Sequence, residues 1–384
     1  MRKNIEPFKK KIWLASPYIH KNSRIYVKQA FDTNWMSTIG ENLNQLEKGI
    51  CQYTGCGASV ALSSGTAALH LAVKLAGVHE GDVVLCSDMT FAATAYPISY
   101  EKGVQVFIDS ERDTWNMDPD ALELALKKYE GKAKAVIAVN LYGTPAKLNQ
   151  IVNLCDKYGV TLIEDAAESL SATYQGRQTG TFGKFNAISF NGNKIITGTS
   201  GGMLLSDDEN AVLRARKWST QSRDEAPWYQ HTELGYNYRM SNVLAGIARG
   251  QLEYLEEHRA GKKKIYDRYK HGLKTLPITM NPYLADDSEP NFWLSCLTID
   301  QDAYKEGITP EKIRTVLASY NVESRPIWKP MHMQPIFMDR DYITVSGRNV
   351  GEDIFARGIC LPSDLNMTEE KQTVVIDIIR SCFA

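Results

Sequence analysis

The sequence has little that suits a membrane, a nucleic acid or a secreted protein. Its 384 residues carry 44 lysines and arginines against 45 aspartates and glutamates, without a basic block. A groove for a phosphate backbone therefore has no compositional support. No stretch approaches the roughly 20 apolar residues of a membrane span, and the opening MRKNIEPFKKKIWLASPY lacks the apolar core of a signal peptide. We expect a cytoplasmic protein with a small-molecule partner, and neither nucleic acid nor membrane as a partner.

Cysteines are few and scattered. The seven cysteines are odd in number and irregularly spaced, which favours reduced thiols over a disulfide framework. Cys51 and Cys56 are the only close pair, and no matching pair follows, so we expect no metal site. The G-x-G-x-x-G turn is also missing, which argues against an oxidoreductase that binds a dinucleotide.

From about residue 45 to 255, apolar runs alternate with helical patterns. The runs ASVALSS, DVVLCS, VQVFID, AKAVIAV, VTLIEDAA, NAISF and GGMLLS predict strands. The segment GTAALHLAVKLAG predicts a helix with Leu69 and Val73 on one face and Gly77 at its end. Continuous apolar runs are typical of strands buried on both faces, hence largely parallel. We predict an α/β fold with a large, mostly parallel sheet of the seven-stranded type and helices on both faces.

The pattern changes after the charged helix LEYLEEHRAGKKKIYDRYKHGLK, which we predict connects two domains. NFWLSCLTI then predicts a strand, and TPEKIRTVLASYN a helix capped by Thr309 with Ile313 and Leu317 in its buried stripe. VESRPIWK and a closing helix complete a smaller α+β unit. The predicted domains are residues 1–255 and 256–384.

Ligands of open α/β sheets sit beyond the carboxyl ends of the strands. Among the loops there, Ser63–Ala67 (SSGTA) joins a strand to a helix start, where free N–H groups and the hydroxyls of Ser64 and Thr66 could cradle a phosphate. As an isolated motif, such a turn more often merely caps its helix. A second loop carries Glu164 and Asp165, of which one could be a helix cap and one a functional carboxylate with a cationic partner.

A third loop, SFNGNKIITGTSGG, places Lys194 directly after a strand. A lysine that attacks a carbonyl group must reach its neutral form, which a confined pocket favours. A phosphate cradle, a carboxylate and a lysine match the phosphate, ring nitrogen and aldehyde of pyridoxal phosphate (PLP). Without further support, these loops indicate an α/β enzyme with a phosphate-containing ligand.

Six ordered motifs carry a resemblance across nearly the whole chain: LSSGTAALHLAV, DMTFAATAYPI, IEDAAESL, SFNGNKIIT with GGML, LGYNYRMSN and SRPIWKPMHMQP. Together they resemble the nucleotide-sugar aminotransferases of the DegT/DnrJ/EryC1/StrS family, which are fold-type I PLP enzymes. The tract TGTSGG departs from the commoner TTGEGG or TTSGGG of relatives, and we have no physical account of that difference.

The resemblance implies roles for individual residues. Lys194 matches the Schiff-base lysine, Asp165 the partner of the ring nitrogen, and Phe91 the aromatic residue that stacks on the ring. Glu168 falls where many relatives have His or Gln near the ring, and it resembles the members that aminate C4 of the sugar. The other cofactor contacts carried over are Gly65, Thr66, Ala67, Ser189, Asn237 and Arg239.

The family works as a homodimer, and LGYNYRMSN resembles the loop that reaches the neighbouring site. Asn237 is the first candidate and Arg239 the second for contacting the phosphate across that interface. For the substrate, the resemblance implies Trp35 and Ser37 at the sugar, and Arg325, Trp328, Lys329 and His332 near the nucleotide. From the residues alone, Arg325 also fits a surface ion pair and His332 a structural histidine.

The resemblance implies transfer of an amino group from L-glutamate, through pyridoxamine phosphate, to a nucleotide-linked 4-keto-6-deoxyhexose. The motifs are closest to transaminases that aminate C4 of UDP-2-acetamido-2,6-dideoxy-4-ketohexose on the way to bacillosamine or legionaminic acid. A C4 aminotransferase of the GDP-perosamine synthase type and a C3-specific aminotransferase are the alternatives. A dehydratase of the same fold replaces the lysine with histidine, which Lys194 argues against; a regulatory member that binds the cofactor without turnover remains open.

Overall fold

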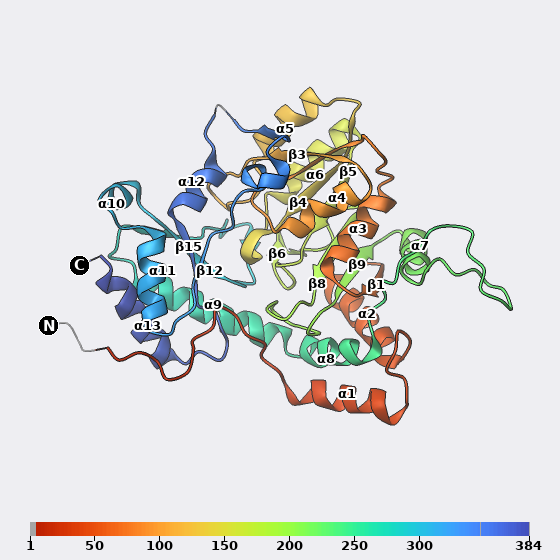
Figure 1. Ribbon diagram of the computed structural model, residues 1–384, viewed down its shortest axis with the longest axis horizontal. Coiled ribbons are helices and arrows are strands. Elements are labelled where there is room, and N and C mark those ends of the chain that lie inside the picture. Colours follow the sequence, from red (N-terminus) through yellow and green to blue (C-terminus); the bar gives the residue numbers. More distant parts are fainter. Residues whose placement is uncertain (1–4, 346, 384) are drawn as a thin grey trace.

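The apolar runs in the first two thirds of the chain form one large sheet in the computed structural model, which describes residues 5–345 and 347–383. The sheet has eight strands in the order β1-β9-β8-β5-β4-β2-β3-β14 (Figure 1). β9 is antiparallel to both neighbours, whereas the other pairs are parallel. The strands are β1 (Ala58–Leu62), β2 (Val83–Ser87), β3 (Val104–Ile108), β4 (Ala133–Val139), β5 (Thr161–Asp165), β8 (Phe185–Ser189), β9 (Gly202–Ser206) and β14 (Asp341–Ile343). The predicted fold class, with its mostly parallel sheet, is confirmed.

Alternate strand residues pack on opposite faces of this sheet. On β2 and β4, Val84 and Ile137 face the core under α3, α4 and α7, whereas Leu85 and Val136 face α5 and α6. Helices α2 and α8 cover β1, β8 and β9 on the face opposite α3. Burial on both faces explains the uninterrupted apolar runs. These helices are α2 (Glu41–Thr54), α3 (Gly65–Leu75), α4 (Tyr96–Tyr100), α5 (Pro119–Lys128), α6 (Leu148–Tyr158), α7 (Glu209–Ser219) and α8 (Asn242–Leu252).

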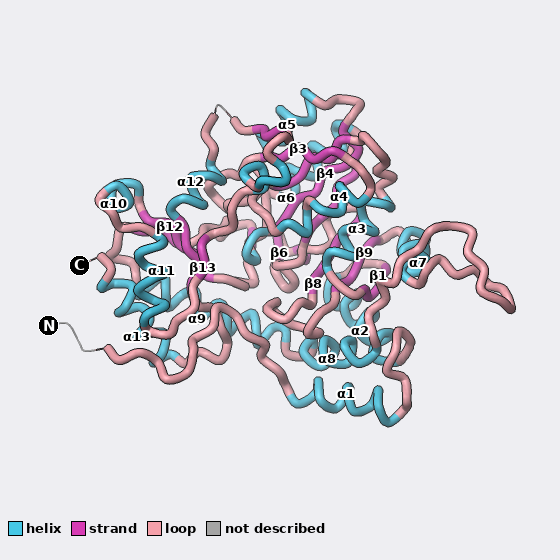
Figure 2. The backbone as a smooth tube through the Cα atoms, in the orientation of Figure 1, coloured by secondary structure: helices cyan, strands magenta, loops and turns pink. Residues whose placement is uncertain are grey.

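A second, antiparallel sheet with the order β10-β12-β15-β13 lies at the other end of the molecule (Figure 2). Helix α9 (Leu255–Gly272) begins in the α2/α8 core with Leu255 and ends in this second core with Tyr269. It is therefore the connecting helix that the charged segment predicted. The remaining elements here are β10 (Ile278–Met280), β12 (Ser295–Ile299), β13 (Arg325–Pro326), β15 (Gly358–Leu361), α10 (Gln301–Lys305), α11 (Pro310–Ser319), α12 (Val350–Arg357) and α13 (Glu369–Ser381).

Two segments lie away from the unit to which the sequence assigned them. β14 pairs parallel with β3 and makes an eighth strand of the large sheet, although it follows residue 256. Ile12 pairs with Val322 and packs in the core of the second sheet, although it precedes residue 255. β14 has three residues, too few for an apolar period to reveal. The boundary at 255/256 itself stays a prediction.

Short elements complete the chain. Helix α1 (Lys21–Asp32) lies along α8 (Figure 1). A small sheet has the order β11-β6-β7, and the described residues also include four short 3₁₀ turns in the loops. Across the described ranges, the helices include none with the length and apolarity that crossing a membrane requires. The small strands are β6 (Thr173–Tyr174), β7 (Arg177–Gln178) and β11 (Ser288–Glu289), and the turns are η1 (Ala92–Thr94), η2 (Leu141–Gly143), η3 (Met331–Met333) and η4 (Pro335–Phe337).

Candidate active site

A cavity of about 280 Å³ lies where the carboxyl ends of β5 and β8 meet the start of α3. β5 and β8 are parallel neighbours, so the loops that follow them emerge at the same edge of the sheet. The structure thus brings together all three loops that the sequence singled out. The lining residues are Ser64, Gly65, Thr66, Leu69, Phe91, Ala93, Asp165, Ala167, Glu168, Ser189, Asn191, Asn193, Lys194, Ser200, Gly201, Trp293 and Trp328.

The start of α3 forms one wall of the cavity. Ser64 caps the helix, with its Oγ accepting the N–H of Ala67 at 3.0 Å. The first-turn N–H groups of Gly65 and Thr66 have no acceptor four residues back, as in any helix. A Cβ on Gly65 would lie 3.0 Å from the Cβ of Ser189, so the glycine lets the helix approach β8 closely. The wall therefore presents free N–H groups and the Ser189 hydroxyl, which suit a phosphate.

Asp165, the last residue of β5, is buried and lines the cavity floor. Its carboxylate accepts the Thr94 hydroxyl at 2.7 Å and the Ala167 N–H at 3.1 Å. Burial raises the pKa of Asp165, against the lowering effects of both hydrogen bonds and of the Lys194 charge. A cationic ring nitrogen placed here would favour the ionised carboxylate.

Lys194 and Glu168 face each other across the cavity. The Nζ of Lys194 lies 3.6 Å from Oε1 of Glu168 and 4.0 Å from the centroid of the Trp293 ring. The other carboxylate oxygen, Oε2, accepts the backbone N–H of Tyr142 at 2.7 Å. Burial raises the pKa of Glu168 to about 7, although Lys194 and the Tyr142 N–H both favour the ionised form. Glu168 therefore has a proton affinity suited to exchange near neutral pH.

Phe91 and Trp328 close the outer side. Their ring centroids lie 5.7 Å apart with an interplanar angle of 55°. Two stacking contacts need about 7 Å between the outer rings, so the space between these two residues is too narrow for a cofactor ring to fit between them. Phe91 is 61% exposed, and the backbone N–H of Trp328 donates to the Tyr142 hydroxyl at 3.0 Å.

These residues fit PLP. The N–H groups at the start of α3 and Ser189 suit its phosphate, buried Asp165 suits its ring nitrogen, and Lys194 suits its aldehyde. The profile of the DegT/DnrJ/EryC1/StrS aminotransferase family matches residues 17–380. The chain belongs to this family.

Individual relatives agree with the family assignment. EpsN of Bacillus subtilis strain 168, named as a pyridoxal phosphate-dependent aminotransferase, is 49% identical over 97% of this chain and 96% of its own. A GDP-perosamine synthase of Caulobacter vibrioides is 31% identical over 94% and 95%. Spr1654 of Streptococcus pneumoniae, named as a sugar aminotransferase and solved with PLP, shares the fold with a TM-score of 0.88, at 23% identity over 97% and 98%. The chain is a PLP-dependent aminotransferase of the nucleotide-sugar aminotransferase family.

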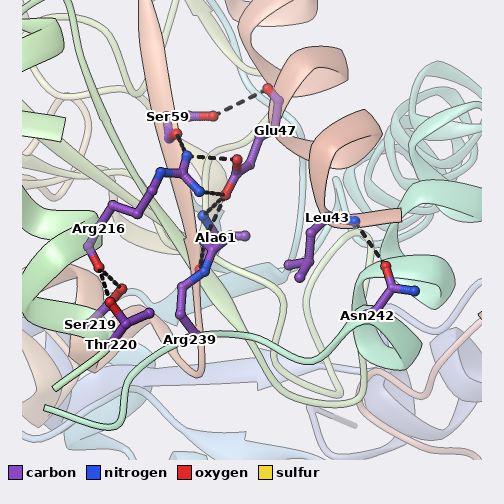
Figure 3. Close-up of polar contacts among 9 residues, drawn as sticks. All are labelled: Leu43, Glu47, Ser59, Ala61, Arg216, Ser219, Thr220, Arg239 and Asn242. Carbon is purple, nitrogen blue, oxygen red and sulfur yellow. Dashed lines mark hydrogen bonds and ion pairs between the residues drawn. The ribbon is translucent and has the colours of Figure 1, made fainter. Parts of the chain in front are cut away.

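Several residues that the family resemblance implied lie away from the cavity in this aminotransferase. Arg239 is buried in its own chain, where it donates to Glu47 at 2.8 Å and to the Ala61 carbonyl at 2.7 Å (Figure 3). Arg216 donates to the same carboxylate at 2.8 Å. One guanidinium nitrogen of Arg239, Nη1, therefore has both of its partners within its own chain. Asn237 pairs with Thr220 in an isolated β-bridge and lies outside the cavity lining.

Two substrate candidates in the C-terminal part have polar partners within the protein. Arg325, whose side chain is exposed, forms an ion pair with the largely covered Glu323. The backbone N–H of His332 donates to buried Asp88 at 2.9 Å, and the ring Nδ1 lies 2.7 Å from the same carboxylate. Burial opposes the charged imidazole, but Asp88 and Glu352 outweigh it and raise the pKa of His332. The contact between His332 and Asp88 connects the segment after Trp328 to the loop that carries Phe91.

Three further residues implied as ligand contacts do not line the cavity: Trp35, Ser37 and Lys329. The carbonyls of Trp35 and Ser37 accept hydrogen bonds from Asn242 at the start of α8. Ala67 also stays outside, because its N–H is taken by Ser64 and its side chain is in the core. Of the substrate candidates, only Trp328 lines the cavity.

Among the residues that sequence reasoning missed, three bear on the functional side chains of this site. Thr94 supports Asp165, Tyr142 holds Glu168, and Trp293 lies under Lys194. Thr94 lies in DMTFAATAYPI and Trp293 in NFWLSCLTI, but neither pattern indicates which side chain turns toward the cavity. Tyr142 has a left-handed backbone with φ of 54°, which is unusual for a residue with a Cβ and often marks a functional site.

Proposed function

We propose that this aminotransferase moves the amino group of L-glutamate to C4 of UDP-2-acetamido-2,6-dideoxy-4-ketohexose. The observation that carries the proposal is the carboxylate of Glu168, 3.6 Å from the Nζ of Lys194 inside the cavity. Glu at this position resembles the family members that aminate C4. The relatives named GDP-perosamine synthases support a 4-keto-6-deoxyhexose as the acceptor.

In this proposal Lys194 moves the proton. When bound, PLP supplies an electron sink for the charge left as the Cα–H bond of the amino donor breaks. In its neutral form Lys194 would take that proton and deliver it to the cofactor, and with the keto sugar the same transfer would run in reverse and end on C4 of the sugar. Glu168 stabilises the ammonium form of Lys194 between the two transfers, because its carboxylate is within 3.6 Å.

The other residues hold the cofactor in place. Asp165 pairs with the protonated ring nitrogen, and the Thr94 hydroxyl orients its carboxylate. Gly65, Thr66 and Ser189 bind the phosphate through the first turn of α3 and the end of β8. Phe91 or Trp328 packs on one ring face, and the other side chain covers the substrate sugar.

We also propose a homodimer in which Asn237 reaches the neighbouring site. Large apolar side chains are exposed on α1, on the turn after it and on the loop after α7, which projects from the body of the molecule (Figure 1). Phe31 is 58% exposed, Ile39 68%, Trp228 64% and Tyr229 78%. Soluble monomers rarely leave such groups uncovered together. Sedimentation velocity at two protein concentrations tests the dimer.

A GDP-linked 4-keto-6-deoxyhexose is the second candidate acceptor. It is favoured by the similarity to the GDP-perosamine synthases of Caulobacter vibrioides, Escherichia coli O157:H7 and Vibrio cholerae, at 31%, 31% and 28% identity. The two candidates differ in the nucleotide and in the substituent at C2 of the sugar.

The test follows the absorbance of the PLP-loaded protein as substrates are added. L-Glutamate should change the spectrum, and the UDP-linked 2-acetamido-4-ketohexose should reverse the change, while the GDP-linked sugar reverses it more slowly. NMR of the product should place the new amino group at C4. Amination at C3, or no reversal by any 4-keto sugar, would overturn the proposal.

A further inference from the structure

Two histidines lie directly behind the loop that carries Lys194. His258, in the first turn of α9, has its Nδ1 2.7 Å from the carbonyl oxygen of Ile195, the residue after Lys194. Its Nε2 lies 2.9 Å from the Nε2 of His20, which precedes α1 and is 238 residues away in the chain. None of the residues predicted from the sequence belongs to this pair.

The hydrogen-bond partners define which nitrogen carries the proton. A carbonyl oxygen can only accept, so the Nδ1 of His258 must donate its hydrogen to Ile195. Burial lowers the pKa of His258 and so favours the neutral ring. A neutral ring protonated at Nδ1 has a bare Nε2, which accepts from the Nε2–H of His20. The order of donation therefore runs from His20 to His258 to Ile195.

Packing holds both rings in this arrangement. The side chain of His258 is buried, whereas His20 is partly exposed. His20 stacks on Tyr254 with centroids 3.7 Å apart and an interplanar angle of 1°. Tyr18 packs edge-on against both imidazoles, at 5.2 Å and 5.7 Å. The rings therefore have little freedom to turn and exchange partners.

The Lys194 loop depends on α8 and α9 for its position. Gln251 on α8 donates to the Thr197 carbonyl at 2.5 Å and accepts the Thr197 N–H at 3.3 Å. The Ile195 carbonyl, two residues closer to Lys194, is held by His258. A displacement of about 1 Å in a reacting group can cost on the order of a hundredfold in rate. The contact at Ile195 thus bears directly on where the amine of Lys194 lies.

We propose that His258 is a positioning residue for Lys194, and that His20 fixes the tautomer of His258 that this role requires. The proposal rests on the proposed role of Lys194. It adds two residues from α9 and the N-terminal segment to the machinery of the transfer, neither of which touches substrate or cofactor.

Protonation of the pair gives the proposal a pH signature. If His20 and His258 both carry a hydrogen on Nε2, two donors meet at 2.9 Å and the contact between them is lost. The titratable groups that bear on His258 are His20 and Lys262, which oppose its protonation, and Glu257, which favours it. Burial lowers the pKa of His258, so the contact with His20 should be lost only below the ordinary imidazole range, while Nδ1 can still donate to Ile195.

The central comparison is between the wild type, His258→Leu and His258→Asn. The asparagine amide nitrogen takes the place of Nδ1 and can still donate to Ile195, whereas leucine fills the space without a donor. Amide hydrogen exchange of residues 196–199 in the cofactor-free protein reports the loop itself, because Thr197, Gly198 and Thr199 donate there to Gln251, Phe190 and the Thr197 hydroxyl.

For His258→Leu we expect exchange in this loop to rise about tenfold and kcat to fall about tenfold, the effect of one lost buried hydrogen bond, with KM for the sugar unchanged. His258→Asn should restore both. His20→Gln, which keeps a donor at the Nε2 position, should behave as wild type, and His20→Leu should resemble a mild form of His258→Leu. A His258→Leu protein with wild-type exchange and kcat, or equal losses in the leucine and asparagine variants, would overturn the proposal.

The role of His258 can be tested even if the proposed sugar substrate is wrong. If no sugar is aminated by the wild type, the hydrogen-exchange comparison in the cofactor-free protein still decides whether His258 holds the loop. If exchange changes as expected but kcat does not, the loop contact is real and its role in positioning Lys194 is wrong. Far-UV circular dichroism confirms that each variant is folded before the comparison.

Discussion

Glu168 and Lys194 form a buried pair in which the carboxylate oxygen lies 3.6 Å from the amine nitrogen. The two residues come from loops after parallel neighbouring strands, β5 and β8. The pair is largely shielded from water, because the side chain of Glu168 is 4% exposed and that of Lys194 is 12% exposed. The Lys194 charge lowers the pKa of Glu168, against the larger raising effect of burial.

The first prediction concerns Glu168→Gln, which keeps an acceptor for the Tyr142 N–H and removes the charge. Since the pKa of Glu168 is about 7, the pH profile of kcat should lose its inflection near neutrality. Rates of single turnover with L-glutamate over a range of pH measure this. An unchanged inflection would assign it to another group.

The same substitution has a consequence for stability. Burial raises the pKa of Glu168 from 4.5 to about 7, so the folded protein binds a proton more tightly than the unfolded chain between these values. The carboxyl group therefore costs stability increasingly as the pH rises from 4.5 through about 7. Glu168→Gln should raise Tm more at about pH 8 than at about pH 5. Differential scanning fluorimetry of the cofactor-free proteins checks the difference.

Lys194→Ala tests the lysine directly. We expect a folded protein that binds PLP reversibly, with no cofactor retained on the chain after borohydride reduction and denaturation. Peptide mass mapping of the reduced wild type should find the cofactor on Lys194. Lys184, which lies outside the cavity lining, offers a matched control as Lys184→Ala. Retention of reducible cofactor by Lys194→Ala would remove the assignment.

Thr94→Val removes the hydroxyl that donates to Asp165 at 2.7 Å and keeps the side-chain shape. Loss of a donor favours the neutral carboxyl, so the pKa of Asp165, which burial already raises, should rise further. PLP affinity should fall about tenfold, with a smaller loss for Thr94→Ser, which retains the hydroxyl. Equilibrium titration with PLP measures both. Equal affinities for the valine variant and the wild type would show that Thr94 does not support the site.

Glu47 is the shared acceptor for Arg216, Arg239 and the N–H of Ala61 (Figure 3). Removal of this carboxylate leaves the buried guanidinium of Arg239 without its partner, so Glu47→Ala should lower the free energy of unfolding by about 3–5 kcal/mol. Chemical denaturation measures the loss. As a control, Asp32→Ala breaks only the exposed pair with Lys28 and should change stability little.

Local patterns in the sequence predicted much of this molecule correctly. The seven longer strands of the large sheet, the helix that begins at Gly65, the Thr309 cap and the long charged helix all follow from neighbouring residues. Lys194, Asp165 and the start of α3 meet because loops after parallel strands share one edge of the sheet, which the strand pattern already implies.

Contacts between distant segments carry no such local signal. The sequence offered Arg239 as a phosphate contact, and it does not indicate that Arg239 forms an ion pair with Glu47, 192 residues away. His20 and His258 are 238 residues apart, and only the folded chain brings their nitrogens to 2.9 Å. Periodicity and capping describe what each segment does with its own neighbours. Which buried charge or ring meets which partner depends on how the segments pack, because a buried polar group must find its partner wherever the fold places one.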